Sequence, residues 1–133
     1  MRRLLFLSLF LLTACSTAQL SIKPLILKEQ NNNETVNLAV GQQFTVQLKE
    51  NPTTGYQWAI DTDIDNLTLE KEEYVLDKMP DFNGQHLVGC GGIKRLVFSV
   101  KKAGTTTLKL KYWRAWEKDS SIVKRFSVTL QAE

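Results

Sequence analysis

The chain has 133 residues, of which 43% are hydrophobic and 23% are charged, and its formal net charge is +3. This length fits one domain that buries a core of its own, and two cysteines are too few for a disulfide-rich scaffold. The nearly balanced charge gives no electrostatic reason to expect a nucleic-acid partner.

The N-terminus has the pattern of a secretory signal. Arg2 and Arg3 precede a mainly apolar run at residues 4–12, and small residues follow the run. The run is too short for a transmembrane helix, which needs about 18 or more apolar residues. Residues 1–14 are therefore expected to be removed, which lowers the net charge from +3 to +1 because two arginines and no acidic residue are lost.

The expected cleavage site, Leu12-Thr13-Ala14-Cys15, resembles the lipobox of bacterial lipoproteins. The resemblance implies cleavage before Cys15 and acylation of its thiol, which would hold the protein to a membrane. Ordinary cleavage near Ala18 is the alternative. Ser16 stands where an aspartate would retain a lipoprotein at the inner membrane of Gram-negative bacteria. The expected location is therefore the bacterial cell envelope, lipid-anchored in the outer membrane and facing the periplasm.

Residues 15–35 are interpreted as a lipidated N-terminus, a tether and a possible first strand. The apolar residues of 20–27 favour a strand, which Pro24 would confine to a sheet edge or a bulge. The polar, Asn-rich stretch that follows has no periodicity and reads partly as a tether. A single domain at 36–133 completes the chain, without repeats.

From residue 36 onward, apolar and polar residues alternate with a period of two, which is typical of half-buried strands. No window has a helical period. The runs with strand character lie at 36–40, 44–48, 56–60, 67–76, 96–100, 108–112 and 126–130. Short strands separated by turn residues predict an all-β, immunoglobulin-like antiparallel sandwich.

In an antiparallel sandwich every second loop lies at the same end, which predicts that three loops meet. We call them the NPTTG loop (residues 50–55), the GCGG loop (77–92) and the RAW loop (114–121). They hold the unusual residues of the chain, whereas the intervening turns are plainly acidic or basic. Loops on a rigid sandwich often form a binding site, so this end is the predicted binding edge.

The NPTTG loop has the chemistry of a stiff turn. Asn51-Pro52 initiates turns, and Gly55 permits a positive φ. Proline also restricts the residue before it. The loop would present the short hydroxyl side chains of Thr53 and Thr54. From the residues alone, a purely structural turn and a binding tool both remain open.

The other two loops carry weaker signals. Gly89-Cys90-Gly91-Gly92 would let another chain approach the backbone closely, although glycine clusters are often hinges. Arg114-Ala115-Trp116 contains two residue types that are enriched in interface hot spots. The alternative is that Trp116 folds back over the edge of the core while Arg114 is solvated.

Catalysis is not expected. His86 is the only histidine and lies four residues before Cys90, but no third residue is positioned to orient the pair as a thiol enzyme requires. No histidine or cysteine cluster has metal-ligand spacing, so neither a metal nor a cofactor is expected.

Taken together, the three loops resemble the chagasin family of cysteine-protease inhibitors. That family has an immunoglobulin-like sandwich with the motifs NPTTGY or NPTTGF, GxGG, and RPW or RPF in this order. Here 51–56 matches the first motif in full, and 89–92 matches the second with Cys90 at the free position. Residues 114–116 match the third, except that Ala115 replaces proline. The resemblance covers Val36 to the C-terminus.

The resemblance implies reversible, tight inhibition of papain-like cysteine proteases by a monomer. The protease-binding residues would be Asn51, Pro52, Thr53, Thr54, Gly55, Tyr56, Gly89, Cys90, Gly91, Gly92, Arg114, Ala115 and Trp116. The alternatives that remain open are an envelope-anchored binding or adhesion module without a protease target, and a thiol enzyme that uses Cys90 and His86.

Overall fold

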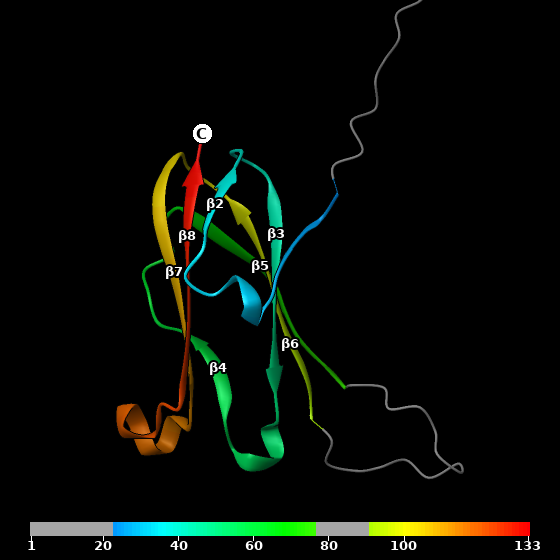
Figure 1. The fold of residues 1–133 in the computed structure, drawn as a ribbon, viewed down its shortest axis with the longest axis vertical. Coiled ribbons are helices and arrows are strands. Elements are labelled where there is room, and N and C mark those ends of the chain that lie inside the picture. Colours follow the sequence, from blue (N-terminus) through cyan, green and yellow to red (C-terminus); the bar gives the residue numbers. More distant parts are fainter. Residues whose placement is uncertain (1–22, 77–90) are drawn as a thin grey trace, which may run out of the picture.

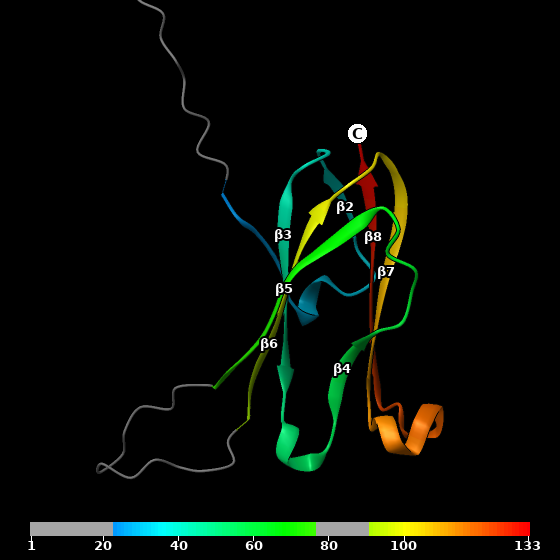
Figure 2. The same ribbon diagram turned by 180° about the vertical axis from the view of Figure 1, so that it is seen from behind.

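The fold is given by a computed structural model, in which residues 23–76 and 91–133 are described. The predicted signal, Cys15, His86, Gly89 and Cys90 lie outside the described residues. Within those residues, eight strands form two four-stranded sheets that face each other (Figures 1 and 2). The predicted all-β, immunoglobulin-like sandwich is confirmed.

The first sheet has the order β1-β3-β6-β5 and the second β2-β8-β7-β4. Three short 3-10 segments lie in the connections that the structure describes. In the first sheet the strands are β1 (Leu25–Leu27), β3 (Gln43–Glu50), β6 (Gly92–Val100) and β5 (Leu67–Leu76). In the second they are β2 (Thr35–Leu38), β8 (Lys124–Ala132), β7 (Gly104–Trp113) and β4 (Gln57–Ile60). The 3-10 segments are η1 (Glu29–Asn31), η2 (Pro52–Thr54) and η3 (Ala115–Ser121).

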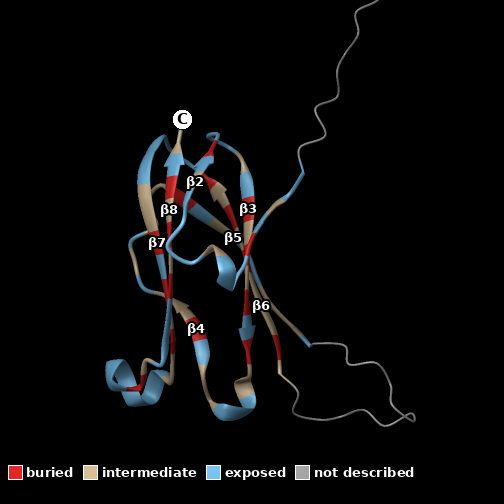
Figure 3. Ribbon diagram, in the orientation of Figure 1, coloured by how far each residue is buried: buried red, intermediate tan, exposed pale blue. Residues whose placement is uncertain are grey.

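The core lies between the sheets and follows from the period of two. Side chains alternate between the faces of a strand, so buried residues recur at every second position along most of β3 and β8 and along parts of β6 and β7, and the buried bands in Figure 3 repeat along these strands. The Phe44 and Phe98 rings stack across β3 and β6 with centroids 5.3 Å apart. Burial of each such side chain contributes about 1.5–3 kcal/mol.

The two N-terminal strands differ from the prediction of a wholly antiparallel sandwich, because β1 pairs parallel with β3 and β2 pairs parallel with β8. The chain crosses from one sheet to the other between β1 and β2, so these two strands do not pair with each other. The Asn-rich stretch makes this crossing. Its Asn33 N–H donates to the Ser127 carbonyl (2.6 Å), and the Asn32 side chain accepts from the Ser127 N–H (2.8 Å). This stretch is therefore bound to β8 and is not a free tether.

The strand ends bring the predicted loops together. Glu50, at the end of β3, pairs with Gly92, which in turn pairs with Leu76 at the end of β5. At the same end, Trp113 of β7 pairs with Gln57 of β4. Figures 1 and 2 show η2 and η3 at this lower end of the sandwich. The predicted convergence of the NPTTG and RAW loops at one end is confirmed.

The acidic run of β5 lies on a solvated surface, as its composition predicts. Lys71 and Glu72 are exposed, and β5 has an irregular register between Leu69 and Lys71. Glu73 forms ion pairs with Lys71 (2.9 Å) and Arg95 (3.3 Å). The hydrogen bond from Lys71, supported by Arg95, lowers the pKa of the Glu73 carboxyl.

Candidate functional site at the loop end

The NPTTG loop is a single 3-10 turn closed by its own residues. Asn51 has an extended backbone and caps η2, because its side-chain oxygen accepts from the Thr53 N–H (3.2 Å). The Thr54 N–H donates to the Asn51 carbonyl (3.2 Å), and the Gly55 N–H donates to the Pro52 carbonyl (2.9 Å). Gly55 ends the turn with a φ of 83°, a conformation that glycine adopts without steric cost. The predicted stiffness follows from these contacts.

The two threonine hydroxyls have internal partners. The Thr53 hydroxyl donates to the side-chain oxygen of Asn51, and the Thr54 hydroxyl donates to the Asn51 carbonyl (2.7 Å). Both threonines are exposed. The tip of the loop therefore presents methyl groups and oxygen lone pairs, because the two hydroxyl hydrogens are already bonded within the loop.

A buried carboxylate holds the base of this loop. Glu50 is 5% exposed, and its Oε2 accepts from the Trp58 N–H (2.8 Å). The Trp58 indole N–H donates to the Lys49 carbonyl (2.8 Å). Because β3 and β4 belong to different sheets, these bonds join the two sheets at the base of the loop. Tyr112 adds a third link, since its hydroxyl accepts from the Asn51 N–H (3.0 Å).

Sequence reasoning assigned Glu50 to the loop and missed this role. The signal was present in the parity of the strand, because Glu50 continues the series Phe44, Val46 and Leu48, all of which are buried. A charged residue at a core position is rarely buried without a partner, so its parity alone indicates a structural hydrogen bond.

Arg114 connects the RAW loop to the NPTTG loop. Its Nε–H donates to the Thr54 carbonyl (3.1 Å), and its guanidinium carbon lies 4.4 Å from the centroid of the Tyr56 ring. Glu117 accepts from the other end of the guanidinium (3.3 Å). The half-buried Tyr56 ring also packs at 5.5 Å from Tyr112. Tyr56 therefore serves as the platform on which Arg114 lies.

Trp116 lies over Gly55 and remains 67% exposed. A methyl group at Gly55 would overlap the indole, coming within 2.9 Å of its Cζ2 atom. Trp116 therefore does not fold back over the core edge, which was the alternative reading. Gly55 is needed for two reasons, its positive φ and the closeness of this ring. Ala115, the first residue of η3, is exposed beside them.

The described part of the GCGG loop, Gly91 and Gly92, lies against the base of the NPTTG loop. Gly91 has a φ of 76°, and a Cβ there would lie 3.2 Å from the Glu50 carbonyl oxygen. A Cβ at Gly92, already within β6, would overlap the Val75 carbonyl and the Tyr74 ring. Gly91 is thus favoured by its positive φ, and Gly92 is required by close packing.

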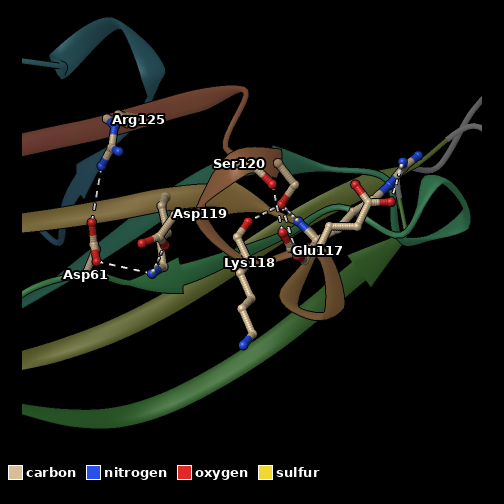
Figure 4. A network of polar contacts seen from close by, with 9 residues as sticks. Asp61, Glu117, Lys118, Asp119, Ser120 and Arg125 are labelled. Carbon is tan, nitrogen blue, oxygen red and sulfur yellow. Dashed lines mark hydrogen bonds and ion pairs between the residues drawn. The ribbon is translucent and has the colours of Figure 1, made fainter.

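A network of charges lies beside η3. Figure 4 shows Asp61 linked to Arg125 (3.2 Å), with Asp119 of η3 on its other side. The Lys111 ammonium lies 3.3 Å from Asp61 and 3.5 Å from Asp119, and 3.7 Å from the centre of the Trp113 ring. Because the Asp119 side chain is 83% exposed, its ion pair adds little stability.

The described residues contain no group of three or more histidine, cysteine, aspartate or glutamate side chains that could hold a metal ion. Nor does the described part of the chain include a helix long and apolar enough to cross a membrane.

A rigid sandwich that holds loops in mutual contact at one end is the architecture of a binding protein that presents an edge to its partner. Residues 37–130 match the family described as chagasin family peptidase inhibitor I42. The chain belongs to the chagasin family, whose members inhibit peptidases and are not enzymes. The thiol-enzyme alternative is therefore set aside.

Named relatives agree with this membership. The chain is 36% identical to chagasin of Trypanosoma cruzi over 104 residues, which are 77% of this chain and 92% of the relative. It is 31% identical to amoebiasin-2 of Entamoeba histolytica over 110 residues, 83% and 85% of the two chains. The crystal structure of the cysteine protease inhibitor EhICP2 from Entamoeba histolytica superposes with a TM-score of 0.69 at 26% identity, over 82% of this chain and 94% of that one.

Proposed function

We propose that this protein is a reversible, tight-binding inhibitor of papain-like cysteine proteases that blocks the active-site cleft with its three loops. One observation carries the proposal: the NPTTG and RAW loops are locked together, through the Arg114–Thr54 hydrogen bond and the Trp116–Gly55 contact, before any partner is present. Family membership supports the inhibitory role, and a solved relative is itself described as a cysteine protease inhibitor.

In this proposal, Thr53 and Thr54 enter the cleft and approach the catalytic cysteine and histidine of the protease. The NPTTG loop suits this role because its conformation is fixed by Asn51, Pro52 and Gly55. A binding loop that is already ordered gives up little conformational entropy on association. Its inward hydroxyls favour contact through methyl groups and acceptor oxygens, which would pair with donors in the cleft.

The flanking loops would contact the substrate groove on either side. The GCGG loop would pair by its backbone along the unprimed side, and Arg114 and Trp116 would contact the primed side. The exposed indole is the kind of aromatic anchor that dominates interface energetics. Three loops with their rim would bury about 1,600 Å², the usual area of a protease–inhibitor interface.

The test is a titration of the purified domain against a panel of papain-like proteases. We expect competitive, slowly reversible inhibition of at least one of them, and none of serine proteases. The alternative, a binding or adhesion module of the cell envelope, is favoured if no papain-like protease is inhibited by a domain whose folding is verified by circular dichroism.

We further propose that the mature protein begins at an acylated Cys15 and is anchored in the bacterial outer membrane, facing the periplasm. The lipobox-like sequence at residues 12–15 and Ser16 support this proposal. More than one acyl chain makes such an anchor stable, because each buried methylene contributes about 0.8 kcal/mol. A fatty-acid analogue should label the wild type and not Cys15→Ala. Equal labelling of both would contradict the proposal.

A further inference from the structure

The RAW loop contains a buried hydroxyl at its base. Ser121 is 6% exposed, and its Oγ accepts from the Arg114 N–H at 2.9 Å. The same oxygen lies 3.0 Å from the Arg114 carbonyl and 2.7 Å from the Lys118 carbonyl. A side chain at the end of the loop therefore contacts the backbone at its start and in its middle.

The backbone of this loop is not regular. Lys118 has a φ of 57° and a ψ of −155°, which divides η3 into two turns. For a residue with a side chain, such a conformation costs about 1–3 kcal/mol and persists only where surrounding contacts hold it. At the ends of these turns, the Glu117 N–H donates to the Arg114 carbonyl and the Ile122 N–H donates to the Asp119 carbonyl. Ser121 joins them, because its hydroxyl reaches the carbonyls of both Arg114 and Lys118.

The start of η3 has the geometry that suits proline. Arg114 is extended, with φ −100° and ψ 112°, as a residue before proline is required to be. Ala115 is the first residue of the 3-10 segment, where a missing N–H costs least and a fixed φ is favourable. Alanine leaves this φ free, so another contact must restrain the loop.

We propose that Ser121 is a positioning residue for protease recognition. Its hydroxyl holds the Arg114 backbone and thereby sets the guanidinium on Thr54 and the Trp116 ring over Gly55. It provides through hydrogen bonds the restraint that a proline at position 115 would provide through its ring. This inference rests on the proposed inhibitory function and deepens it, because it assigns a role to a residue outside the three motifs.

The test compares two adjacent serines. Ser121→Ala removes the buried hydroxyl, and Ser120→Ala removes an exposed hydroxyl that donates to the Glu117 carbonyl. We expect Ser121→Ala to raise the inhibition constant about five- to 150-fold, which corresponds to the cost of 1–3 kcal/mol for a partly buried amide left without a partner, and Ser120→Ala to change it less than twofold. Amide hydrogen exchange at Arg114 should accelerate only in Ser121→Ala.

Two further variants separate positioning from general destabilisation. Ala115→Pro in the Ser121→Ala background should recover several-fold of the lost affinity, whereas in the wild type the same proline should gain less. In a chain that carries Arg114→Ala and Trp116→Ala, removing the Ser121 hydroxyl should no longer affect inhibition. An equal loss with and without these two side chains would overturn the inference.

The two proposals fail in different ways. A wild type that inhibits no papain-like protease overturns the proposed function. A wild type that inhibits, together with a Ser121→Ala variant that inhibits equally well and keeps slow exchange at Arg114, overturns the role of Ser121.

Discussion

The NPTTG loop and the RAW loop lie side by side, but different contacts hold them. The first is ordered by its own consecutive residues, since Asn51 caps the turn and Gly55 ends it. The second is ordered by a residue seven positions from Arg114 and by contacts with the first loop. One loop is thus encoded locally, and the other depends on the folded molecule around it.

This difference teaches how the binding edge is built. The NPTTG loop can act as a fixed wedge because nothing outside it needs to move into place except the residues that bond to its base, Trp58 and Tyr112. The RAW loop uses that wedge as a support, with Arg114 lying on Tyr56 and Trp116 lying on Gly55. A substitution in the NPTTG loop should therefore also change the conformation of the RAW loop, whereas a substitution in the RAW loop should affect the NPTTG loop less.

The largest effect is expected from Thr54→Arg, which places a bulky cation at the tip of the wedge. We expect inhibition to weaken by about 100-fold or more, corresponding to the loss of a hot spot of over 2 kcal/mol. The thermal midpoint should change little because Thr54 is exposed. Thr68→Arg, the same change on exposed β5 residue Thr68, is the control and should inhibit like the wild type. If Thr54→Arg instead lowers the thermal midpoint strongly while each folded molecule keeps its affinity, the NPTTG loop is only a structural turn.

Gly55→Ala tests the dependence of one loop on the other. The positive φ alone should cost about 1–2 kcal/mol of stability, and the methyl group should also displace Trp116. Gly41→Ala is a matched control, because Gly41 has a φ of 86° and nothing lies within 4 Å of the added Cβ. Both variants should lose similar stability in chemical denaturation, but only Gly55→Ala should lose affinity, by roughly tenfold for a displaced aromatic contact. Equal affinities would show that Trp116 does not contribute.

Arg114→Lys should weaken inhibition by about 1–1.5 kcal/mol, because lysine keeps the charge and loses the Nε–H donor and the planar group over Tyr56. Arg125→Lys affects an exposed ion pair with Asp61 and should be nearly neutral. Inhibition constants at low and high salt complete the measurement. If only the charge of Arg114 contributes, Arg114→Lys and the wild type will have the same inhibition constant at low salt, which would contradict the prediction.

Lys118→Gly should have the smallest effect. Glycine relieves the strained φ of 57° but adds backbone freedom to the unfolded chain, a penalty of about 0.5–1 kcal/mol. We expect a gain of no more than about 1 kcal/mol in unfolding free energy and little change in affinity, because Ser121 still joins the loop ends. Lys102→Gly on an exposed turn serves as the reference. A lower stability for Lys118→Gly would show that the conformation is not strained.

The same contrast explains what the sequence could predict. Strand alternation and turn residues are local signals, so the sandwich, its core and the shape of the NPTTG loop were accessible from the residues alone. The position of Trp116 over Gly55 could not be predicted from the sequence, because it depends on residues 61 positions apart coming together. Nor could the role of Ser121, since a serine near the end of a polar loop has no distinguishing pattern.

The N-terminal strands mark another limit. Pro24 correctly indicated an edge position, and β1 is an edge strand of its sheet. However, period two does not distinguish parallel from antiparallel pairing, and the Asn-rich crossing gave no periodic signal. It is held partly by local bonds around Asn31 and partly by hydrogen bonds to β8, which no local pattern of the segment encodes.

The parallel pairing of β1 with β3 also determines at which end of the domain the N-terminal segment enters. Leu25 pairs with Phe44 near the start of β3, whereas β3 reaches the binding edge only at Glu50. The chain therefore enters the domain on the far side from its loops. With the anchor proposed at Cys15, the ten peptide links from there to Leu25 span at most about 36 Å. The end of the sandwich opposite the loops would then face the membrane. An incoming protease would reach the loops without having to pass between the inhibitor and the lipid.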